Sequence, residues 1–468
     1  MGLTLALALR NLLRNRRRSL ATLIALAIGA ASILMFGGYS ANIRYSLLSS
    51  YVRSGGHLQL QYQDFFLYGS GNPTAYGIPG YARIIDEIRA DPVLGKMVLV
   101  ATPTLQFGGI AGNYDEGVSR TIVGTGFVPA DVNRMRVWNE FRIILDSPRF
   151  VLEGSPPESA IVGVGVARVL LLCKALKVAD CPSPAREAAG GGGAALPGDV
   201  AALTQLVTPE KAATPGSGPP TIELLASTGR GTPNVAALRV VAAEGQGFKE
   251  LDDVAVILHL EQAQRLVYGR GEPRATAVMV QLRNTSMIPE ARRRLGELAR
   301  KLSPADRPLS VLDFEELNPF YVQTLDLFDT IFGFIFALIA GIVLFTVGNT
   351  MAAAVVERTV EIGTVRAVGL RQSGIRRLFM AEGMMLGCAG TLLGAASALA
   401  IASVVNALQL TWLPPGSTEP LPLTLMIWGE TRLIVGTVLG LMAIAVLSAW
   451  LPAYRAARLS IVDALRHV

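Results

Sequence analysis

The chain has 468 residues, of which 51% are hydrophobic and only 17% are charged, and its mean hydropathy is +0.42. Soluble domains carry about 25% charged residues, so the composition excludes a wholly water-exposed protein and a disordered one. Three cysteines exclude a small disulfide scaffold, and a net charge of +6 identifies no partner until the charges are located.

Residues 1–18 are predicted to form an interfacial amphipathic helix. Its leucines and arginines separate onto two faces, Leu5, Leu9, Leu12 and Leu13 against Arg10, Arg14 and Arg17. This pattern suits a helix that lies along the inner lipid headgroups. A disordered basic leader is the alternative.

The first membrane span is predicted at residues 19–43, which carry no charge. The run is longer than the apolar core of a signal peptide, and no cleavage site follows it. We therefore interpret this span as an uncleaved anchor.

Residues 44–329 are predicted to form a large extracytoplasmic domain of mixed α/β structure. Alternating residues in GGHLQLQYQDF indicate a half-buried strand, and SAIVGVGVARVLLL reads as a strand that turns into a helix. A stretch at about 185–230 rich in glycine, alanine and proline predicts a flexible insertion. Cys173 and Cys181 flank CKALKVADC, so either a disulfide between them or two independent small residues is expected.

Three further charge-free runs follow, each long enough for a helix that crosses a bilayer. We expect spans at residues 330–356, 383–409 and 433–454, separated by a segment at 357–382 and a short loop at 410–432, with a tail at 455–468. Pro414 and Pro415 end the third run, which is longer than one span needs.

The positive charges give these spans a direction. Residues 1–18, 357–382 and 455–468 carry +5, +2 and +2, whereas the rest of the chain carries −3. The positive-inside rule therefore predicts that both termini and the 357–382 segment are cytoplasmic and that the large domain is periplasmic. The excess of base is explained by topology, so no nucleic acid is expected as a partner.

Motifs for catalysis are missing from the sequence. No G-x-x-x-x-G-K-[ST] phosphate loop, H-E-x-x-H zinc motif or G-x-S-x-G nucleophile elbow occurs, and the three histidines have no metal-ligand spacing. We expect no catalytic site, no cofactor site and no metal site on this chain.

Glycines recur at four-residue spacing within the later spans. The pairs are Gly383 with Gly387, Gly390 with Gly394, and Gly436 with Gly440. Such G-x-x-x-G pairs let helices approach closely. They predict helix packing within the chain or a dimer interface. Cys388, in the span at residues 383–409, is interpreted as a packing residue.

The segment 357–382 is short but ordered in pattern. ERTVEIGTVRAVG places acids, arginines and two glycines on what reads as a continuing helix, and the following helix ends in AEG. A solvated connection between two spans is the alternative to a docking element.

These motifs resemble the FtsX-type permease domain, the family of MacB, LolC and LolE, also described as type VII ABC transporters or mechanotransmission systems. The ends ALRNLLRNRRRSLAT and LPAYRAARLSIVDALRH resemble the same family. So does the order of one span, a large domain and three spans. The resemblance implies four transmembrane helices with a MacB-like periplasmic core domain in a multi-pass protein of the bacterial inner membrane.

The resemblance also implies an ATPase-coupling segment. Its expected members are Glu357, Arg358, Glu361, Ile362, Gly363, Arg366, Ala367 and Gly369. ATP and Mg would be held by a separate ABC ATPase in two copies, because the chain opens directly at the permease. A second permease, identical or paralogous, membrane lipids and a periplasmic adaptor or carrier are the other expected partners.

The implied function is that of an ABC exporter permease. ATP hydrolysis would move the periplasmic domains and extract or expel a lipoprotein, lipid, peptide or amphipathic drug. The alternative is non-transporting mechanotransmission that regulates a periplasmic cell-wall hydrolase. A membrane-anchored scaffold that needs no ATP is a third, less favoured interpretation.

Overall fold

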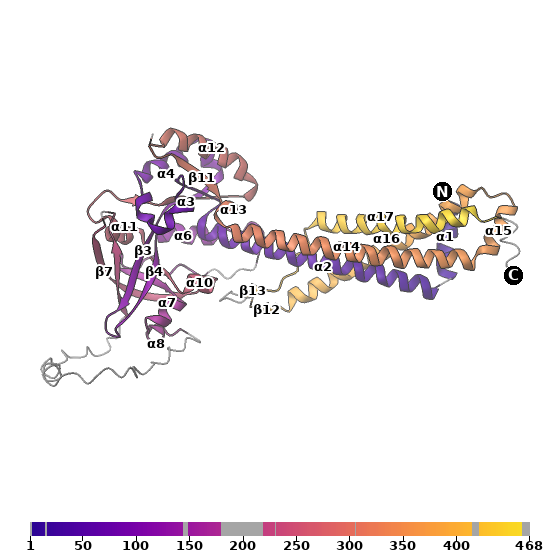
Figure 1. Cartoon of the computed structure of the whole chain (residues 1–468), viewed down its shortest axis with the longest axis horizontal. Coiled ribbons are helices and arrows are strands. Elements are labelled where there is room, and N and C mark those ends of the chain that lie inside the picture. Colours follow the sequence, from indigo (N-terminus) through magenta and orange to yellow (C-terminus); the bar gives the residue numbers. More distant parts are fainter. Residues whose placement is uncertain are drawn as a thin grey trace. The chain divides into compact units, whose positions relative to one another are not determined.

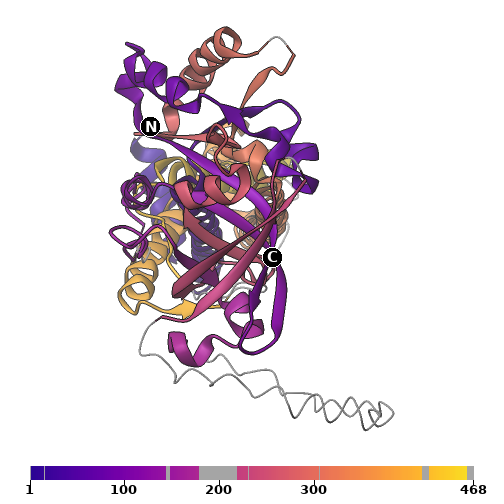
Figure 2. The same cartoon turned by 90° about the vertical axis from the view of Figure 1, so that its left-hand side faces the viewer.

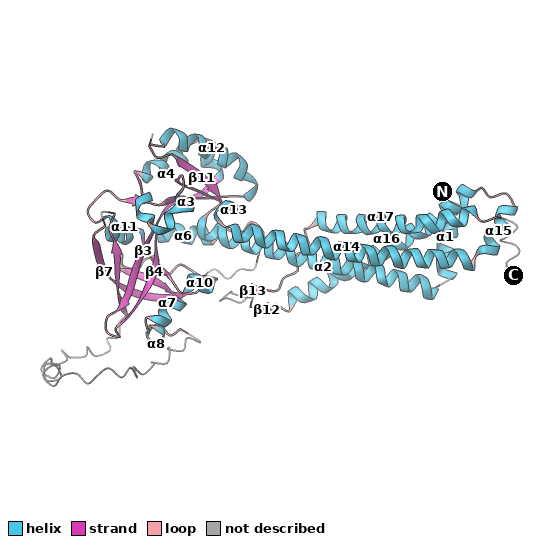
Figure 3. Ribbon diagram, viewed as in Figure 1, coloured by secondary structure: helices cyan, strands magenta, loops and turns pink. Residues whose placement is uncertain are grey.

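The computed structural model describes residues 2–14, 16–143, 148–178, 219–229, 231–304, 306–413 and 421–460. The chain divides into two compact units. The helical unit comprises Met1–Leu48, Pro319–Trp412 and Leu421–Val468, and the strand-rich unit comprises Ser49–Asn318 and Leu413–Pro420. Figure 1 labels the elements of both units, and Figure 3 shows the strands gathered in one and the long helices in the other.

The helical unit contains six helices and a short hairpin in the part of the chain that is described. They are α1 (Gly2–Arg14), α2 (Arg16–Gly55), α14 (Pro319–Glu357), α15 (Thr359–Ala367), α16 (Gln372–Ala407), α17 (Thr431–Arg458), β12 (Thr411–Trp412) and β13 (Leu421–Pro422). Four of the helices, α2, α14, α16 and α17, are long and apolar enough to cross a membrane. The expectation of four membrane helices is confirmed.

The helix bounds differ from the expected ones in several places. Helix α2 runs from Arg16 to Gly55 rather than over residues 19–43, and α14 begins at Pro319 rather than at residue 330. Helix α1 is described as far as Arg14 and Asn15 lies outside the described residues, so the single helix expected for residues 1–18 stays a prediction. The predicted 357–382 segment is divided, since its last eleven residues belong to α16.

Small residues allow the long helices to pack closely. A Cβ atom at Gly383 would lie 2.5 Å from the Ala449 Cβ on α17, and one at Gly394 would lie 2.5 Å from the Ala27 oxygen on α2. Real Cβ atoms essentially never approach so closely. The small-residue spacing therefore serves contacts between helices of this chain.

The strand-rich unit is built on a small closed barrel. Its strands are β3 (Val98–Asn113), β4 (Val118–Phe127), β8 (Ala255–His259), β5 (Ser159–Gly163), β7 (Pro233–Glu244) and β6 (Thr221–Ser227). They pair in that order, and the circle closes because β6 also pairs with the far half of β3, where Gly109 faces Ala226. A Cβ at Gly109 would lie 2.6 Å from the Leu225 oxygen, so closure requires a glycine there.

Apolar side chains fill the inside of the barrel. Phe107, Leu224, Val240, Val256 and Leu258 are buried in one core cluster. The helices and turns around the barrel strands are α6 (Pro129–Arg136), α7 (Val164–Val169), α8 (Cys173–Leu176), α10 (Lys249–Asp252) and α11 (Leu260–Tyr268). Strand-to-helix connections such as β5–α7 agree with the expected mixture of strands and helices, whereas a MacB-like α/β core remains a prediction.

Three more strands extend the sheet from β3. They are β10 (Ala277–Leu282), β1 (Leu58–Tyr62) and β11 (Leu309–Asp313). The remaining elements are α3 (Phe65–Tyr68), η1 (Gly69–Gly71), η2 (Pro73–Tyr76), β2 (Ile78–Pro79), α4 (Tyr81–Ala90), α5 (Leu94–Met97), β9 (Arg274–Ala275), η3 (Thr285–Met287), α12 (Ile288–Leu302) and α13 (Phe314–Leu317). Helices α4 and α12 bury their apolar faces against this extension, and Figure 2 shows the unit from another side.

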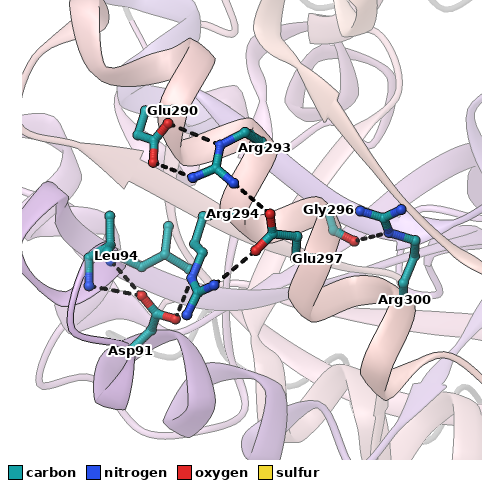
Figure 4. A network of polar contacts seen from close by, with 9 residues as sticks. Asp91, Leu94, Glu290, Arg293, Arg294, Gly296, Glu297 and Arg300 are labelled. Carbon is teal, nitrogen blue, oxygen red and sulfur yellow. Dashed lines mark hydrogen bonds and ion pairs between the residues drawn. The ribbon is translucent and has the colours of Figure 1, made fainter.

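Ion pairs fix α12 beside the end of α4. Arg294 donates from Nε to Asp91 Oδ2 and from Nη1 to Glu297 Oε2, both over 2.8 Å (Figure 4). Arg293 on the same helix pairs with Glu290 and Glu297. The Asp91 side chain is only 7% exposed, so its pairing with Arg294 is the most shielded contact of this network.

The predicted flexible insertion is partly wrong. Residues 221–227 of the expected 185–230 stretch form β6, because Ile222, Leu224 and Ala226 are buried while their neighbours are exposed. Residues 185–218 lie outside the described residues, as does Cys181. The expected disulfide with Cys173 therefore stays a prediction, and Cys388 is a free cysteine.

Candidate functional site

The predicted coupling segment begins at a break between two helices. Helix α14 ends at Glu357 and α15 begins at Thr359, so Arg358 alone separates them. Its backbone, at φ −109° and ψ 15°, departs from helical geometry. The side chain of Arg358 is nonetheless 8% exposed, which is unusual for arginine and requires partners for its charge.

Those partners come from two other helices. Arg358 Nη1 donates to Glu382 Oε1 over 2.9 Å, and its Nη2 donates to the backbone oxygen of Asn11 over 3.0 Å. The Asn11 Nδ2 also donates to Glu382 Oε1, over 2.7 Å. We call Asn11, Arg358 and Glu382 the junction cluster, because they join α1, the α14–α15 break and α16.

Two exposed ion pairs lie beside the junction cluster in sequence. Arg14 Nη2 is 2.6 Å from Glu361 Oε1, and Arg18 Nη2 is 2.8 Å from Glu357 Oε1. All four side chains are between 38% and 58% exposed. Water screens such pairs, so they add little stability.

The end of α15 forms a tight turn. Gly369, with φ at +106°, donates its N–H to the Arg366 oxygen, and the N–H of Leu370 donates to the Val365 oxygen. These two bonds are those of a Schellman motif, which needs a left-handed residue and therefore favours glycine. The turn stops the helix and directs the chain into α16.

This turn leaves apolar side chains in solvent. Val365 is 46% exposed, Val368 is 85% exposed and Leu370 is 42% exposed. We call these three residues the α15 apolar patch. Three exposed arginines follow closely in sequence, Arg371, Arg376 and Arg377. An exposed apolar patch with a basic border is typical of a protein-binding surface.

The predicted coupling residues divide into three groups in the structure. Arg358, Ile362 and Gly363 are buried. Glu357 and Glu361 form exposed ion pairs with the N-terminal arginines, and Arg366 donates to the backbone oxygen of Leu459. Ala367 and Gly369 are exposed beside the α15 apolar patch.

The glycines predicted for helix packing or a dimer interface have defined neighbours in most cases. Gly383 and Gly387 face α17, Gly390 and Gly394 face α2, and Gly440 faces Phe336 on α14. Gly436 differs, because a Cβ there would meet no described atom within 4 Å. Most of these positions are thus explained by packing within the chain.

Sequence reasoning missed two features of the site. Asn11 is the only uncharged polar residue in the run from Leu5 to Leu13, a signal that pointed to a buried partner. The exposure of the α15 apolar patch was also missed, because a hydropathy pattern assigns valine and leucine to the interior. The sequence signal was the spacing of Val365, Val368 and Leu370 around a glycine.

The strand-rich unit holds two described histidines. His57 is fully buried, and burial lowers its pKa to about 3. Its Nδ1 accepts the Leu282 N–H over 3.0 Å, which fixes the neutral ring. Burial also lowers the pKa of His259, whose Nε2 lies 3.0 Å from the Ser155 hydroxyl oxygen. Among the described residues, no group of three or more His, Cys, Asp or Glu is placed to hold a metal.

The fold and this site define a class: a membrane protein with four apolar helices and a separate strand-rich unit. Residues 330–461 match the FtsX-like permease C-terminal family, a range that includes the α14–α15 break, α15 and Glu382. Three curated relatives extend the similarity.

An uncharacterized ABC transporter permease of Methanocaldococcus jannaschii is 27% identical over 237 residues, 49% of this chain and 54% of the relative. The lipoprotein-releasing system transmembrane protein LolC of Xylella fastidiosa is 25% identical over 236 residues, 47% of this chain and 53% of LolC. The macrolide export ATP-binding/permease protein MacB of Escherichia coli is 38% identical over 143 residues, 31% of this chain and 20% of MacB.

The chain thus matches about half the length of the first two relatives and a fifth of MacB. The matched family range and these relatives make the chain similar to FtsX/MacB/LolC-type ABC transporter permeases.

Proposed function

We propose that this chain is the transmembrane permease subunit of an ABC exporter in the bacterial inner membrane. A separate ABC ATPase, in two copies, binds the α15 segment on the cytoplasmic side and supplies the energy of ATP hydrolysis. The strand-rich unit lies in the periplasm and moves in response. The permease itself needs no catalytic residue for this role, because the nucleotide chemistry belongs to the ATPase.

The observation that carries the proposal is the α15 apolar patch. Val368 is 85% exposed, although the turn that carries it is held by the two hydrogen bonds of the Schellman motif. The exposed Arg371 follows it closely in sequence. An apolar contact supplies affinity and a basic border supplies attraction to an acidic partner surface. The patch lies within the range that matches the FtsX-like permease family.

The cargo class follows from the relatives. LolC is named for lipoprotein release and MacB for macrolide export. We infer a substrate that is amphipathic and already at the outer side of the membrane: a lipoprotein, a lipid, a peptide or an amphipathic drug. A second permease, identical or paralogous, completes the transporter, and a periplasmic adaptor or carrier receives the cargo.

The test is affinity purification of the full chain from its native membranes with measurement of bound ATPase activity. The proposal expects an ABC ATPase to be retained by the wild-type chain and lost from the V368E/L370E variant. The matched control is V137E, because Val137 is an equally exposed valine, at 79%, in the strand-rich unit. Equal retention by both variants would refute docking through α15.

Glu361 and Arg366 make a weaker test of docking. Glu361 pairs with Arg14, and Arg366 donates to Leu459, so alanine at either position removes a contact within the chain. A cell-wall hydrolase that copurifies with the wild-type chain and its ATPase, with no cargo, would instead favour signal transmission without transport.

A further inference from the structure

Helix α1 pairs with α15 through Arg14 and Glu361, and with the residue before α15 through the junction cluster. We propose that Asn11, Arg358 and Glu382 are positioning residues that hold α15 in one orientation against α1 and α16. This inference rests on the proposed function, in which α15 is the surface that the ATPase binds. The cluster would make α1 part of the coupling machinery rather than only a membrane-surface anchor.

The first argument is the contact of Arg358 with the backbone of α1. The oxygen of Asn11, in the last described turn of α1, accepts from Arg358 Nη2 over 3.0 Å. Arg358 directly precedes Thr359, the first residue of α15. This hydrogen bond therefore connects α1 to the start of α15.

The second argument is the burial of Glu382. Its side chain is 1% exposed, and its Oε1 accepts from both Arg358 and Asn11. A buried charge that loses its partner is strongly destabilised. If α1 or the α14–α15 break moved away from α16, the buried Glu382 carboxylate would lose a hydrogen-bond donor. The three elements are therefore expected to move together.

The third argument is that α14 does not fix the direction of α15. The helix breaks at Arg358, so the orientation of α15 must come from side-chain contacts. Ile362 and Gly363 pack inward, and the exposed pair of Arg14 with Glu361 holds the outer side. Exposed pairs contribute little, so the shielded polar contacts that remain are the junction cluster at the start of α15 and the donation of Arg366 to the Leu459 oxygen at its end.

The experiment measures the position of α15 without any ATPase. Nitroxide labels are placed on R14C and E361C in the full chain in lipid nanodiscs, with C388A to remove the free cysteine. The side chains of Arg14 and Glu361 touch, so their labels should show strong dipolar coupling. The readout is the ratio of coupled to uncoupled spin pairs.

In N11D the amide donor becomes a carboxylate facing Glu382. We expect the ratio to fall about tenfold, the shift that loss of one charge-assisted hydrogen bond causes. The double variant N11D/E382Q exchanges donor and acceptor, because the amide at 382 can donate to the carboxylate at 11. The ratio should return to within about twofold of the wild-type value. A general loss of structure would not be rescued in this way.

The matched control is R10D, which places the same charge on an exposed position of α1 and should leave the ratio unchanged. An unchanged ratio in N11D, or a fall that N11D/E382Q does not reverse, would overturn the positioning role. The two proposals fail separately: the spin labels report on the cluster, whereas ATPase retention by V368E/L370E reports on docking.

Discussion

Arg358 and Glu382 form a buried ion pair, with Nη1 and Oε1 2.9 Å apart and the two side chains 8% and 1% exposed. They are 24 residues apart in sequence and lie on opposite sides of the α15 turn. Buried pairs of this kind cost desolvation energy, so their retention is better explained by a defined geometry than by stability alone. The pair closes the α15 segment into a loop with a fixed base.

The first prediction concerns this pair. In E382A the guanidinium of Arg358 remains buried without its carboxylate. We expect the free energy of unfolding of the helical unit to fall by about 3–5 kcal/mol. Titration of the purified chain with a denaturing detergent, followed by far-UV circular dichroism, measures this change.

The double variant R358M/E382L provides the control. It removes both charges and replaces them with apolar side chains of similar volume, so it should lose less stability than E382A. A loss in the double variant equal to the sum of the two single losses would show that the two residues do not interact.

The second prediction concerns the contact of Arg294 with Asp91 in the strand-rich unit (Figure 4). R294A leaves the shielded Asp91 carboxylate without its cation, and we expect the unit to lose about 1–3 kcal/mol of stability. Arg300 on the same helix bonds only to the Gly296 oxygen among the interactions described, so R300A should change stability by less than about 0.5 kcal/mol. Thermal unfolding of the full chain compares the two variants, and equal effects would contradict the assignment.

Much of the fold was predictable because its signals are local. Charge-free runs identify membrane helices by length alone, and alternation identifies strands such as residues 58–62. The closure of the barrel was not predictable, because it depends on β3 pairing with β6 more than a hundred residues away. Gly109 is an example. The need for a glycine there becomes evident only when β6 is paired with β3, because the Leu225 oxygen then occupies the place of a Cβ atom.

The coupling role of residues 357–369 stays a prediction, but the structure shows which of its side chains the sequence pattern could not place. Arg358 is buried, because it has partners on α1 and α16 that a local pattern cannot reveal. The exposed residues include two valines and a leucine, Val365, Val368 and Leu370, which a hydropathy pattern assigns to the interior.

The third prediction is a pH dependence due to His57. Burial lowers the pKa of His57 from its ordinary 6.5 to about 3, so the unfolded chain binds a proton between these values and the folded chain does not. Stability contributed by the neutral ring is therefore fully present above about pH 6.5 and falls as the pH drops towards 3. Thermal unfolding of the full chain between pH 7.5 and about pH 4.5 should show a falling midpoint.

The variant H57N separates this effect from that of the carboxylates. Asparagine can still accept from the Leu282 N–H but does not titrate, so the variant should be less stable at neutral pH and less sensitive to acid. If the slope of the midpoint against pH were the same in both proteins, His57 would not be the source.

The fourth prediction compares Gly383 and Gly436, which each begin a G-x-x-x-G pair but have different neighbours. A Cβ at Gly383 would meet Ala449 at 2.5 Å, whereas one at Gly436 would meet no described atom within 4 Å. G383V should force α16 from α17 and cost about 1–3 kcal/mol in detergent titration. G436V should leave the fold intact, so any loss of a dimer measured for it by mass photometry assigns Gly436 to the surface between two copies. Normal stability in G383V would contradict the packing of α16 on α17. A valine at position 436 is too large for the close helix contact that a G-x-x-x-G pair permits. An unchanged oligomeric state in G436V would therefore exclude Gly436 from the interface between two copies.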